Sequence, residues 1–349
     1  MPGAAGLPPD ALAAQFASFG EEGRLNGSSL YERLALAVAS DSDLLALAAH
    51  ARNRPVPNLF FAAVHYLILK GTAHPLAALY RAAAEGTRAD DPYPCFRSFC
   101  REHADAICSL LATRLVQTSV VRRCAYLVPA FALVAARAGG RPLALVDVGA
   151  SAGLNLLWDR YGYDYGGGRH CGNPASPVHI TCKLRGERFP PLPKVLPAVA
   201  FRTGIDLAPI DVRDPDAALW LRALVWPDHA DNAALLDAAI SVARHDPPPV
   251  RTGDALDILP EVLAMAPDEA ALCVYHNHTL NQFSPEARDR FAALIDKHAA
   301  ARDIYRLAAE SLSTLEVTLE LTVSAAGART SELLARCHAH GRWIEWLAG

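Results

Sequence analysis

The sequence lacks several features that would mark particular classes of protein. Its 349 residues carry a net charge of −4, so it has no excess of basic residues of the kind that nucleic-acid-binding proteins use. Near the start, no basic segment precedes an apolar one, and apolar runs such as residues 58–69 are shorter than the ~20 residues that cross a bilayer. We therefore predict a cytoplasmic protein with no nucleic-acid partner and no membrane partner.

Closely spaced cysteine pairs are also missing. The chain has eight cysteines, but none of them form a Cys-x-x-Cys pair, which argues against a zinc ribbon. Eight cysteines in a chain of this length do not indicate a small disulfide scaffold either. We expect reduced, mostly buried thiols and no resident metal ion. The 52% of hydrophobic and 20% of charged residues are typical of a globular protein, and the length is sufficient for two domains.

The pattern of apolar residues changes near residue 137. Before it, apolar residues recur at helical spacing in residues 29–38, 43–51, 58–70 and 104–116. After it, short apolar runs alternate with amphipathic segments, which is typical of an α/β fold. We predict an all-helical N-terminal cap or substrate domain over residues 1–137. We predict a Rossmann-like domain over residues 138–349, with an inserted loop and strand at about 161–197.

Residues 143–156, LALVDVGASAGLNL, form the most informative segment. The continuous apolar run predicts a strand buried on both faces, with Asp147 at its carboxyl end. Gly149 and Gly153 enclose a turn into a predicted helix, whose first N–H groups favour an anionic ligand group. Ser151 stands where the dinucleotide fingerprint Gly-x-Gly-x-x-Gly has its middle glycine, which argues against nicotinamide and flavin dinucleotides. A glycine turn with no ligand is the alternative.

Polar residues also follow three later predicted strands. Asp206 ends the strand near residues 198–205, where its carboxylate is expected to accept two ribose hydroxyls or to cap a turn. Asp254 follows a third strand, and the N-cap of the next helix is its alternative role. His276 and His278 follow a fourth. Open α/β sheets bind ligands at this carboxyl edge, so we expect a small-molecule site there.

The two histidines are the predicted catalytic residues. Two positions apart on an extended chain, His276 and His278 are expected to point to the same side. One of them then acts as a base toward a nucleophile while the other orients the substrate. The alternatives are a metal ion shared with an acidic partner such as Glu310, and purely structural hydrogen bonds.

Two further groups lie close to these segments in the sequence. Arg122 and Arg123 are expected at the solvated end of a helix, with binding of an anionic substrate group as the alternative. Tyr161, Tyr163 and Tyr165 are expected either to form an aromatic wall over a cofactor or to pack without a ligand.

The segment Asp147-x-Gly149-x-x-x-Gly153 resembles motif I of the class I S-adenosylmethionine-dependent methyltransferases, whose loop wraps the methionine end of the cofactor. The resemblance implies a seven-stranded methyltransferase-type sheet, a ribose contact at Asp206 and an adenine contact at Asp254. The chain lacks the Asp/Asn-Pro-Pro-Tyr motif of amino-methylating enzymes. The cofactor-binding residues that the resemblance implies are Asp147, Gly149, Ala150, Ser151, Gly153, Asn155, Asp206, Asp254 and Ala255.

A second resemblance covers nearly the whole chain. The sequence is similar to the bacterial family DUF2332, which has no established general activity, although Ser119 and Val120 stand where Asn-Glu is expected. We therefore expect a methyltransferase that uses S-adenosylmethionine and acts on a small molecule. The alternatives are a nonenzymatic nucleoside-ligand sensor or partner-binding protein, and a metal-assisted hydrolase. The segments that carry the DUF2332 resemblance are residues 28–31, 62–71, 116–118, 147–166, 204–207 and 220–227.

Overall fold

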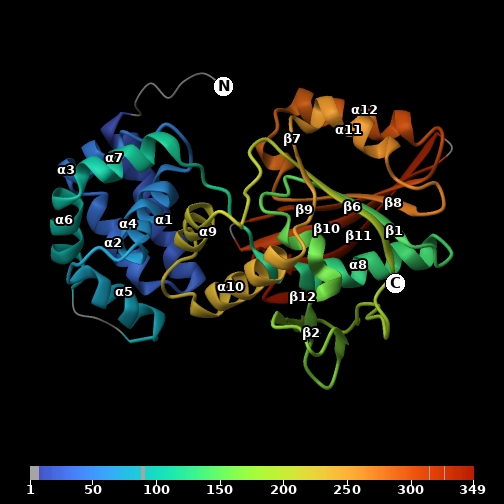
Figure 1. Ribbon diagram of the computed structural model, residues 1–349, viewed down its shortest axis with the longest axis horizontal. Coiled ribbons are helices and arrows are strands. Elements are labelled where there is room, and N and C mark those ends of the chain that lie inside the picture. Colours follow the sequence, from blue (N-terminus) through green and yellow to red (C-terminus); the bar gives the residue numbers. More distant parts are fainter. Residues whose placement is uncertain (1–7, 88–90, 314, 326) are drawn as a thin grey trace. The chain divides into compact units, whose positions relative to one another are not determined.

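The computed structural model describes residues 8–87, 91–313, 315–325 and 327–349, and the chain divides into two compact units (Figure 1). Unit 1 comprises Met1–Thr118 and Arg213–Ala234, and unit 2 comprises Ser119–Val212 and Leu235–Gly349. The division falls before the helix α8 (Cys124–Arg137), whereas the sequence predicted it after that helix. Helix α9 (Pro215–Ala223) belongs to unit 1 although it follows strands of unit 2 in the sequence.

Unit 1 is helical, which confirms the prediction of a helical N-terminal region. Side-chain oxygens of Ser28 and Asp41 cap α2 and α3 by accepting backbone N–H groups, as helix N-caps do. Helix α4 is apolar around most of its circumference, and it lies within a core of aromatic rings that includes Phe16, Phe61 and Trp226. Besides α9, the helices are α1 (Pro9–Asn26), α2 (Ser29–Val38), α3 (Ser42–Ala48), α4 (Val56–Leu69), α5 (Leu76–Ala84), α6 (Tyr93–Glu102) and α7 (Ala104–Thr113).

Unit 2 is built on a nine-stranded sheet in the order β5-β12-β11-β10-β9-β8-β1-β6-β7. The neighbouring strands β7, β6, β1, β8 and β9 are parallel to one another. Beyond β9, the strands β10, β11 and β12 continue the sheet in antiparallel order. A mixed α/β fold with a large, mainly parallel sheet is therefore confirmed. The strands are β1 (Leu143–Val148), β5 (Lys183–Arg185), β6 (Val199–Asp206), β7 (Val250–Thr252), β8 (Ala271–Asn277), β9 (Ile304–Ser311), β10 (Glu316–Ala325), β11 (Ala328–His338) and β12 (Trp343–Trp346).

The number of strands corrects the expectation of seven. Strands β5 and β12 are only three and four residues long, too short to show an alternating pattern in the sequence. They pair with each other, Lys183 beside Trp343, although they lie far apart in the chain. The inserted region also forms a separate small sheet in the order β3-β2-β4, from β2 (Gly162–Asp164), β3 (His170–Gly172) and β4 (His179–Thr181).

Helices cover both faces of the parallel strands, as in a doubly wound sheet (Figure 1). One face packs against α11 (Ala255–Ala264) and α12 (Pro285–His298) through residues such as Val146, Val274 and Phe291. The other packs against α8, where Phe131 meets Tyr275 edge to face with centroids 5.3 Å apart. All six residues of β1 are buried, in agreement with its continuous apolar run.

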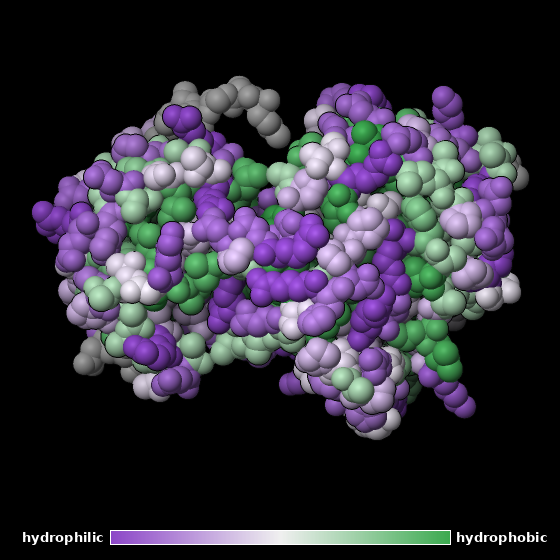
Figure 2. Space-filling view, in the orientation of Figure 1, coloured by the Kyte–Doolittle hydropathy of each residue, from purple (hydrophilic) through white to green (hydrophobic). Residues whose placement is uncertain are grey.

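The surface carries few large apolar side chains. Figure 2 shows hydrophilic side chains over much of the visible face, with smaller hydrophobic areas between them. Among the residues that the structure describes, no helix combines the length and the apolar character needed to cross a membrane.

Candidate functional site

The carboxyl edge of the parallel strands contains a topological switch point. From β1 the chain proceeds to β6 and β7 on one side, and it then returns to the other side of β1 with β8 and β9. The loops that leave β1 and β8 therefore diverge to opposite sides, and ligands of open α/β sheets bind in the crevice between such loops. Asp147, Asp206 and His276 all lie at this edge, one on each of three neighbouring strands.

The glycine loop after β1 is held against β6. The N–H groups of Gly149 and Ala150 both donate to the Ile205 carbonyl, at 2.8 and 3.2 Å. Ser151 has a φ of +54°, and its N–H donates to Asp206 Oδ2 at 2.7 Å. The loop conformation is therefore fixed by backbone bonds and by Asp206, the carboxylate that was predicted to bind ribose.

The helix that follows the loop is different from the one expected. Leu154–Arg160 forms a 3₁₀ helix, η2, entered from Gly153 in the left-handed region with φ +68°. A short 3₁₀ helix does not supply the aligned dipoles and free N–H groups of an α-helix N-terminus, so the anion site expected at this turn is not formed in that way. The apolar side chains of η2 are buried, and tertiary packing rather than helix propensity decides its conformation.

Gly149 allows the two loops at the switch point to touch. A Cβ added there would lie 2.3 Å from Thr279 Oγ1, and the φ of +83° itself favours glycine. Thr279 follows β8, and its hydroxyl donates to the Val148 carbonyl at 3.0 Å. The sequence predicted a ligand beside this glycine, but the Thr279 side chain occupies that space.

Asp206 and Asp254 make the hydrogen bonds of caps. The Asp206 carboxylate accepts from Ser151 N–H and, at 2.9 Å, from Ala208 N–H in the turn that follows β6. Asp254 is the N-cap of α11 and accepts the Leu256 N–H at 2.9 Å, while Ala255 is buried at the start of the helix. Both aspartates lie at strand ends, as predicted, and their contacts match the capping alternatives.

The two histidines lie on opposite faces of the sheet, which corrects the expectation that they share one side. His276 bonds through Nδ1 to Glu310 at 2.6 Å, whereas His278 bonds through Nδ1 to Ser311 at 3.0 Å. Glu310 and Ser311 are consecutive residues of β9, so their side chains point to opposite faces. The alternation fails because β8 ends at Asn277 and His278 takes a φ of +54°.

His276 is buried on the face of the sheet that packs against α12. Its ring is fully inaccessible and meets Phe291 edge to face, and its Nε2 has no partner among the described residues. Burial lowers the pKa of His276, an effect that the Glu310 carboxylate opposes. Glu310 also accepts the N–H groups of Thr279 at 3.2 Å and Leu280 at 3.1 Å. The pair therefore positions the loop after β8.

The other face of the same edge carries Asp147 and Tyr275, which are neighbours on β1 and β8. Asp147 is 3% exposed, and burial raises its pKa to about 7. The Tyr275 hydroxyl opposes this rise, the negative charge of Asp206 adds to it, and the positive charge of Arg123 opposes it. A carboxyl group with this pKa changes its charge near neutral pH.

Arginine and tyrosine side chains of η1 (Val121–Arg123) and α8 complete this face. Arg122 and Arg123 are 6% and 8% exposed, so the expectation of a solvated helix end is wrong for both. Arg123 Nε donates to the Ala339 carbonyl at 3.0 Å, and Tyr126 donates to Asn277 Oδ1 at 3.2 Å. Cys124 lies beside the predicted cofactor residue Asn155, whose Oδ1 accepts its thiol at 3.4 Å.

Some of these residues escaped the sequence analysis. Tyr126, Tyr275 and Asn277 were not among the predicted site residues. Arg123 was named as a residue that could bind an anionic group, and its position directly before the apolar run of α8 is the signal that could have marked it as buried. The tyrosine cluster packs without a ligand: its three hydroxyls donate to backbone carbonyls of Leu154, Trp158 and Ala125.

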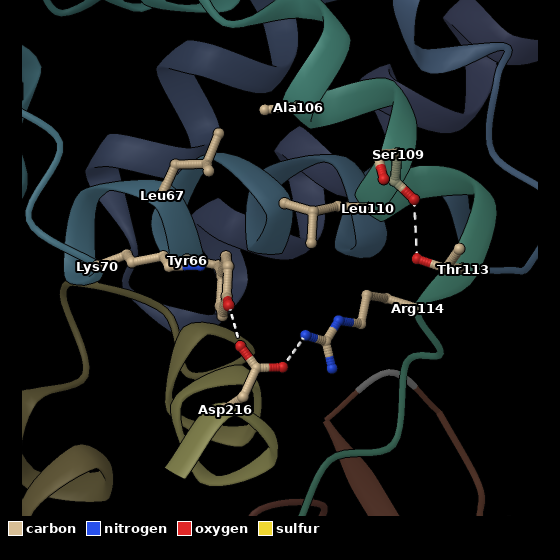
Figure 3. Close-up of a pocket in the computed structure, with 9 residues that line it drawn as sticks. All are labelled: Tyr66, Leu67, Lys70, Ala106, Ser109, Leu110, Thr113, Arg114 and Asp216. Atoms are coloured by element: carbon tan, nitrogen blue, oxygen red, sulfur yellow. Dashed lines mark hydrogen bonds and ion pairs between the residues drawn. The ribbon is translucent and has the colours of Figure 1, made fainter.

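Unit 1 contains a separate pocket of about 480 Å³ (Figure 3). The Asp216 carboxylate accepts hydrogen bonds from the Tyr66 hydroxyl and from Arg114, and the Arg114 guanidinium also lies over the rings of Tyr66 and Trp220. The cations of this pocket are therefore engaged by protein groups. It contains none of the residues that the sequence singled out as catalytic or cofactor-binding.

In the part of unit 2 that the structure describes, metal ligands do not gather as the hydrolase alternative requires. Within the described ranges, no group of three or more histidine, cysteine, aspartate or glutamate side chains is placed to hold a metal ion. For His276 and His278, the physical reason is that the two side chains lie on opposite faces of the sheet.

Comparison with known proteins places the chain in one family. A family model described as an uncharacterized protein conserved in bacteria, DUF2332, matches residues 13–346. No curated protein and no solved structure matches the chain. Because the family model spans both units, from α1 to β12, the chain belongs to the DUF2332 family.

Proposed function

We propose that unit 2 binds S-adenosylmethionine at the carboxyl edge of its sheet and that the protein methylates a small molecule. The observation that carries the proposal is the order of the parallel strands. Counted along the chain without the insertion, they run third-second-first-fourth-fifth, which is the order of doubly wound nucleotide-binding sheets. The segment Asp147-x-Gly149-x-x-x-Gly153 stands at the switch point of this order, where such sheets bind their ligands.

The residue types at the edge match those that bind a nucleoside cofactor, and its amino-acid part would require the Thr279 side chain to move away from Gly149. The backbone from Gly149 to Gly153 would border its amino-acid part, and Asp206 and Asp254 would bind ribose and adenine from the ends of the next two strands. Buried polar atoms that lack partners among the described residues, such as the Tyr275 hydroxyl, support a polar ligand on this face. When bound, the cofactor would supply a methyl group activated for in-line attack.

We propose that Asp147, rather than either histidine, accepts or holds the proton in this reaction. Burial lowers the pKa of His278 to about 3, so its ring is neutral at physiological pH and serves as a hydrogen-bonding group. His276 is enclosed by the core and acts as a positioning residue. Asp147, with a pKa raised to about 7, is matched to accepting or holding a proton near neutrality.

A nonenzymatic ligand sensor is the second candidate. It is favoured by the two histidines, because the His278 ring, with a pKa of about 3, is a weak base and the His276 ring is fully buried. Such a protein would bind the nucleoside ligand with the same residues but would transfer no methyl group. Turnover therefore separates the two candidates, and binding alone does not.

Titration calorimetry with S-adenosylmethionine and S-adenosylhomocysteine tests the proposal. We expect micromolar binding, about −8 kcal/mol. The variant Asp254→Ser keeps a helix cap but removes the carboxylate, and it should weaken binding. Asp257→Ser, which changes another carboxylate in the first turn of α11, is the matched control and should not. A folded protein that binds neither nucleoside would refute the proposal. Binding without turnover of any acceptor panel would favour the sensor.

A further inference from the structure

Arg123 is a buried cation that forms no ion pair with an acidic side chain among the described residues. It is 8% exposed, and burial lowers its pKa. Its Nε donates to the Ala339 carbonyl, but within the described chain no carboxylate forms an ion pair with its guanidinium. A buried charge is costly unless it is paired. The neighbouring Arg122 is equally buried, but its guanidinium donates to the backbone and hydroxyl oxygens of Thr181, both at 3.0 Å.

Two more hydrogen-bonding groups on this face have no partner at hydrogen-bond geometry among the described residues. Tyr275 and Asn277 point to the α8 side of the sheet, because the first packs on Phe131 and the second accepts from Tyr126. The Tyr126 bond occupies Asn277 Oδ1 and leaves the Nδ2 donor buried with no partner in the described structure. The Tyr275 hydroxyl is also buried with no partner at hydrogen-bond geometry among the described residues, and Asp147, whose pKa it lowers, is its nearest acidic neighbour on β1. Native proteins rarely leave such groups unsatisfied, so each requires an explanation.

These groups lie close to one another. Tyr275 and Asn277 stand two residues apart on β8, and Arg123 lies one helical turn before Tyr126, whose hydroxyl bonds to Asn277. The cluster combines a planar guanidinium with an amide N–H and a hydroxyl, all three of them donors. It holds one permanent positive charge with Asp147 nearby, which suits a monoanion better than a phosphate dianion.

We propose that Arg123, Tyr275 and Asn277 form a binding subsite for a carboxylate group of a ligand. Arginine binds carboxylates through two parallel N–H bonds, and the amide and hydroxyl would satisfy the remaining lone pairs. The subsite adds a ligand contact to the proposed function. The identity of the ligand rests on that function. The carboxylate belongs either to the amino-acid part of the cofactor or to the methyl acceptor.

Matched ligand pairs test the subsite in the full-length protein. The first pair is S-adenosylhomocysteine and 5′-methylthioadenosine, which lacks the amino-acid part. The second set pairs acetate and benzoate with acetamide and benzamide. Dissociation constants are measured by calorimetry for the nucleosides and by ligand-observed NMR for the small acids. We expect the wild type to prefer the carboxylate member of at least one pair.

Arg123→Met should remove this preference, weakening carboxylate binding by about ten-fold to a hundred-fold, as expected for a lost charge-assisted bond. Arg122→Met is the control, since it removes an equally buried guanidinium that protein oxygens already satisfy. Should Arg123→Met fail to fold, Asn277→Leu in a Tyr126→Phe background removes the amide donor and its partner together, and it should also reduce the preference.

The source of the carboxylate follows from which pair responds. A preference confined to the nucleoside pair assigns the subsite to the cofactor, and one confined to the small acids assigns it to the acceptor. Preference for small acids that Arg123→Met abolishes, without any nucleoside binding, would support the subsite and reject the proposed cofactor. Equal binding within every pair, or a preference that survives both variants, would overturn the inference.

Discussion

Asp147→Asn should stabilise the protein at alkaline pH. In the folded protein the pKa of Asp147 is about 7, against 3.8 for the same group exposed to solvent. Between these values the folded state binds a proton that the unfolded state has released, so stability falls as pH rises through this interval. At about 1.4 kcal/mol for each pKa unit, the full cost of ionising the buried carboxyl reaches an upper limit of about 4 kcal/mol above pH 8.

The assay is urea denaturation of the wild type and of Asp147→Asn at several pH values from 4 to 8. Histidines with a lowered pKa, such as His278, also bind protons differently in the two states, so the informative quantity is the difference in unfolding free energy between variant and wild type. We expect that difference to move in favour of the variant by several kcal/mol from pH 4 to pH 8. Asp254→Asn is the control, because asparagine caps a helix as well as aspartate does. A difference for Asp147→Asn that does not change with pH would refute the assignment of a raised pKa.

Three further substitutions test the geometry of the edge. Glu310→Ala should lower the free energy of unfolding by about 3–5 kcal/mol, because it leaves a buried histidine and several backbone N–H groups without their acceptor. A loss below about 1 kcal/mol in chemical denaturation would contradict these bonds. Gly149→Ala should lower the melting temperature far more than Gly139→Ala, since both glycines have positive φ but only the first would place a Cβ against Thr279; equal shifts would show that this contact is absent. Asp254→Ala should cost about 1 kcal/mol as a lost N-cap, and Asp254→Ser should restore it; equal stability of all three proteins would argue against the cap.

Local patterns predicted the parts of the fold that depend on local sequence. The buried strand β1, the polar ends of β6 and β8, and the helical nature of unit 1 follow from apolar periodicity and strand-end residues. The N-cap role of Asp254 was one of the two roles predicted for that residue. These features depend on residues within a few positions of one another, which is the range over which sequence patterns are informative.

Non-local contacts explain what the sequence did not reveal. Arg123 was expected to be solvated, but the turn between β11 and β12 covers it, and Gly341 in that turn leaves no room for a Cβ beside the Arg122 carbonyl. His278 was expected to face the same way as His276, but its positive φ ends the alternation. Neither the packing of a distant turn nor a single left-handed residue is encoded in a pattern of polar and apolar positions.

The most direct test of the central claim is a crystal structure of the protein with S-adenosylhomocysteine. The account predicts the nucleoside at the carboxyl edge of β1, β6 and β8, with its ribose at Asp206 and its amino-acid part beside the loop from Gly149 to Gly153. A nucleoside bound in the pocket of unit 1, or a fully folded protein that binds none at saturating concentration, would contradict the claim that this sheet edge is a methyltransferase site.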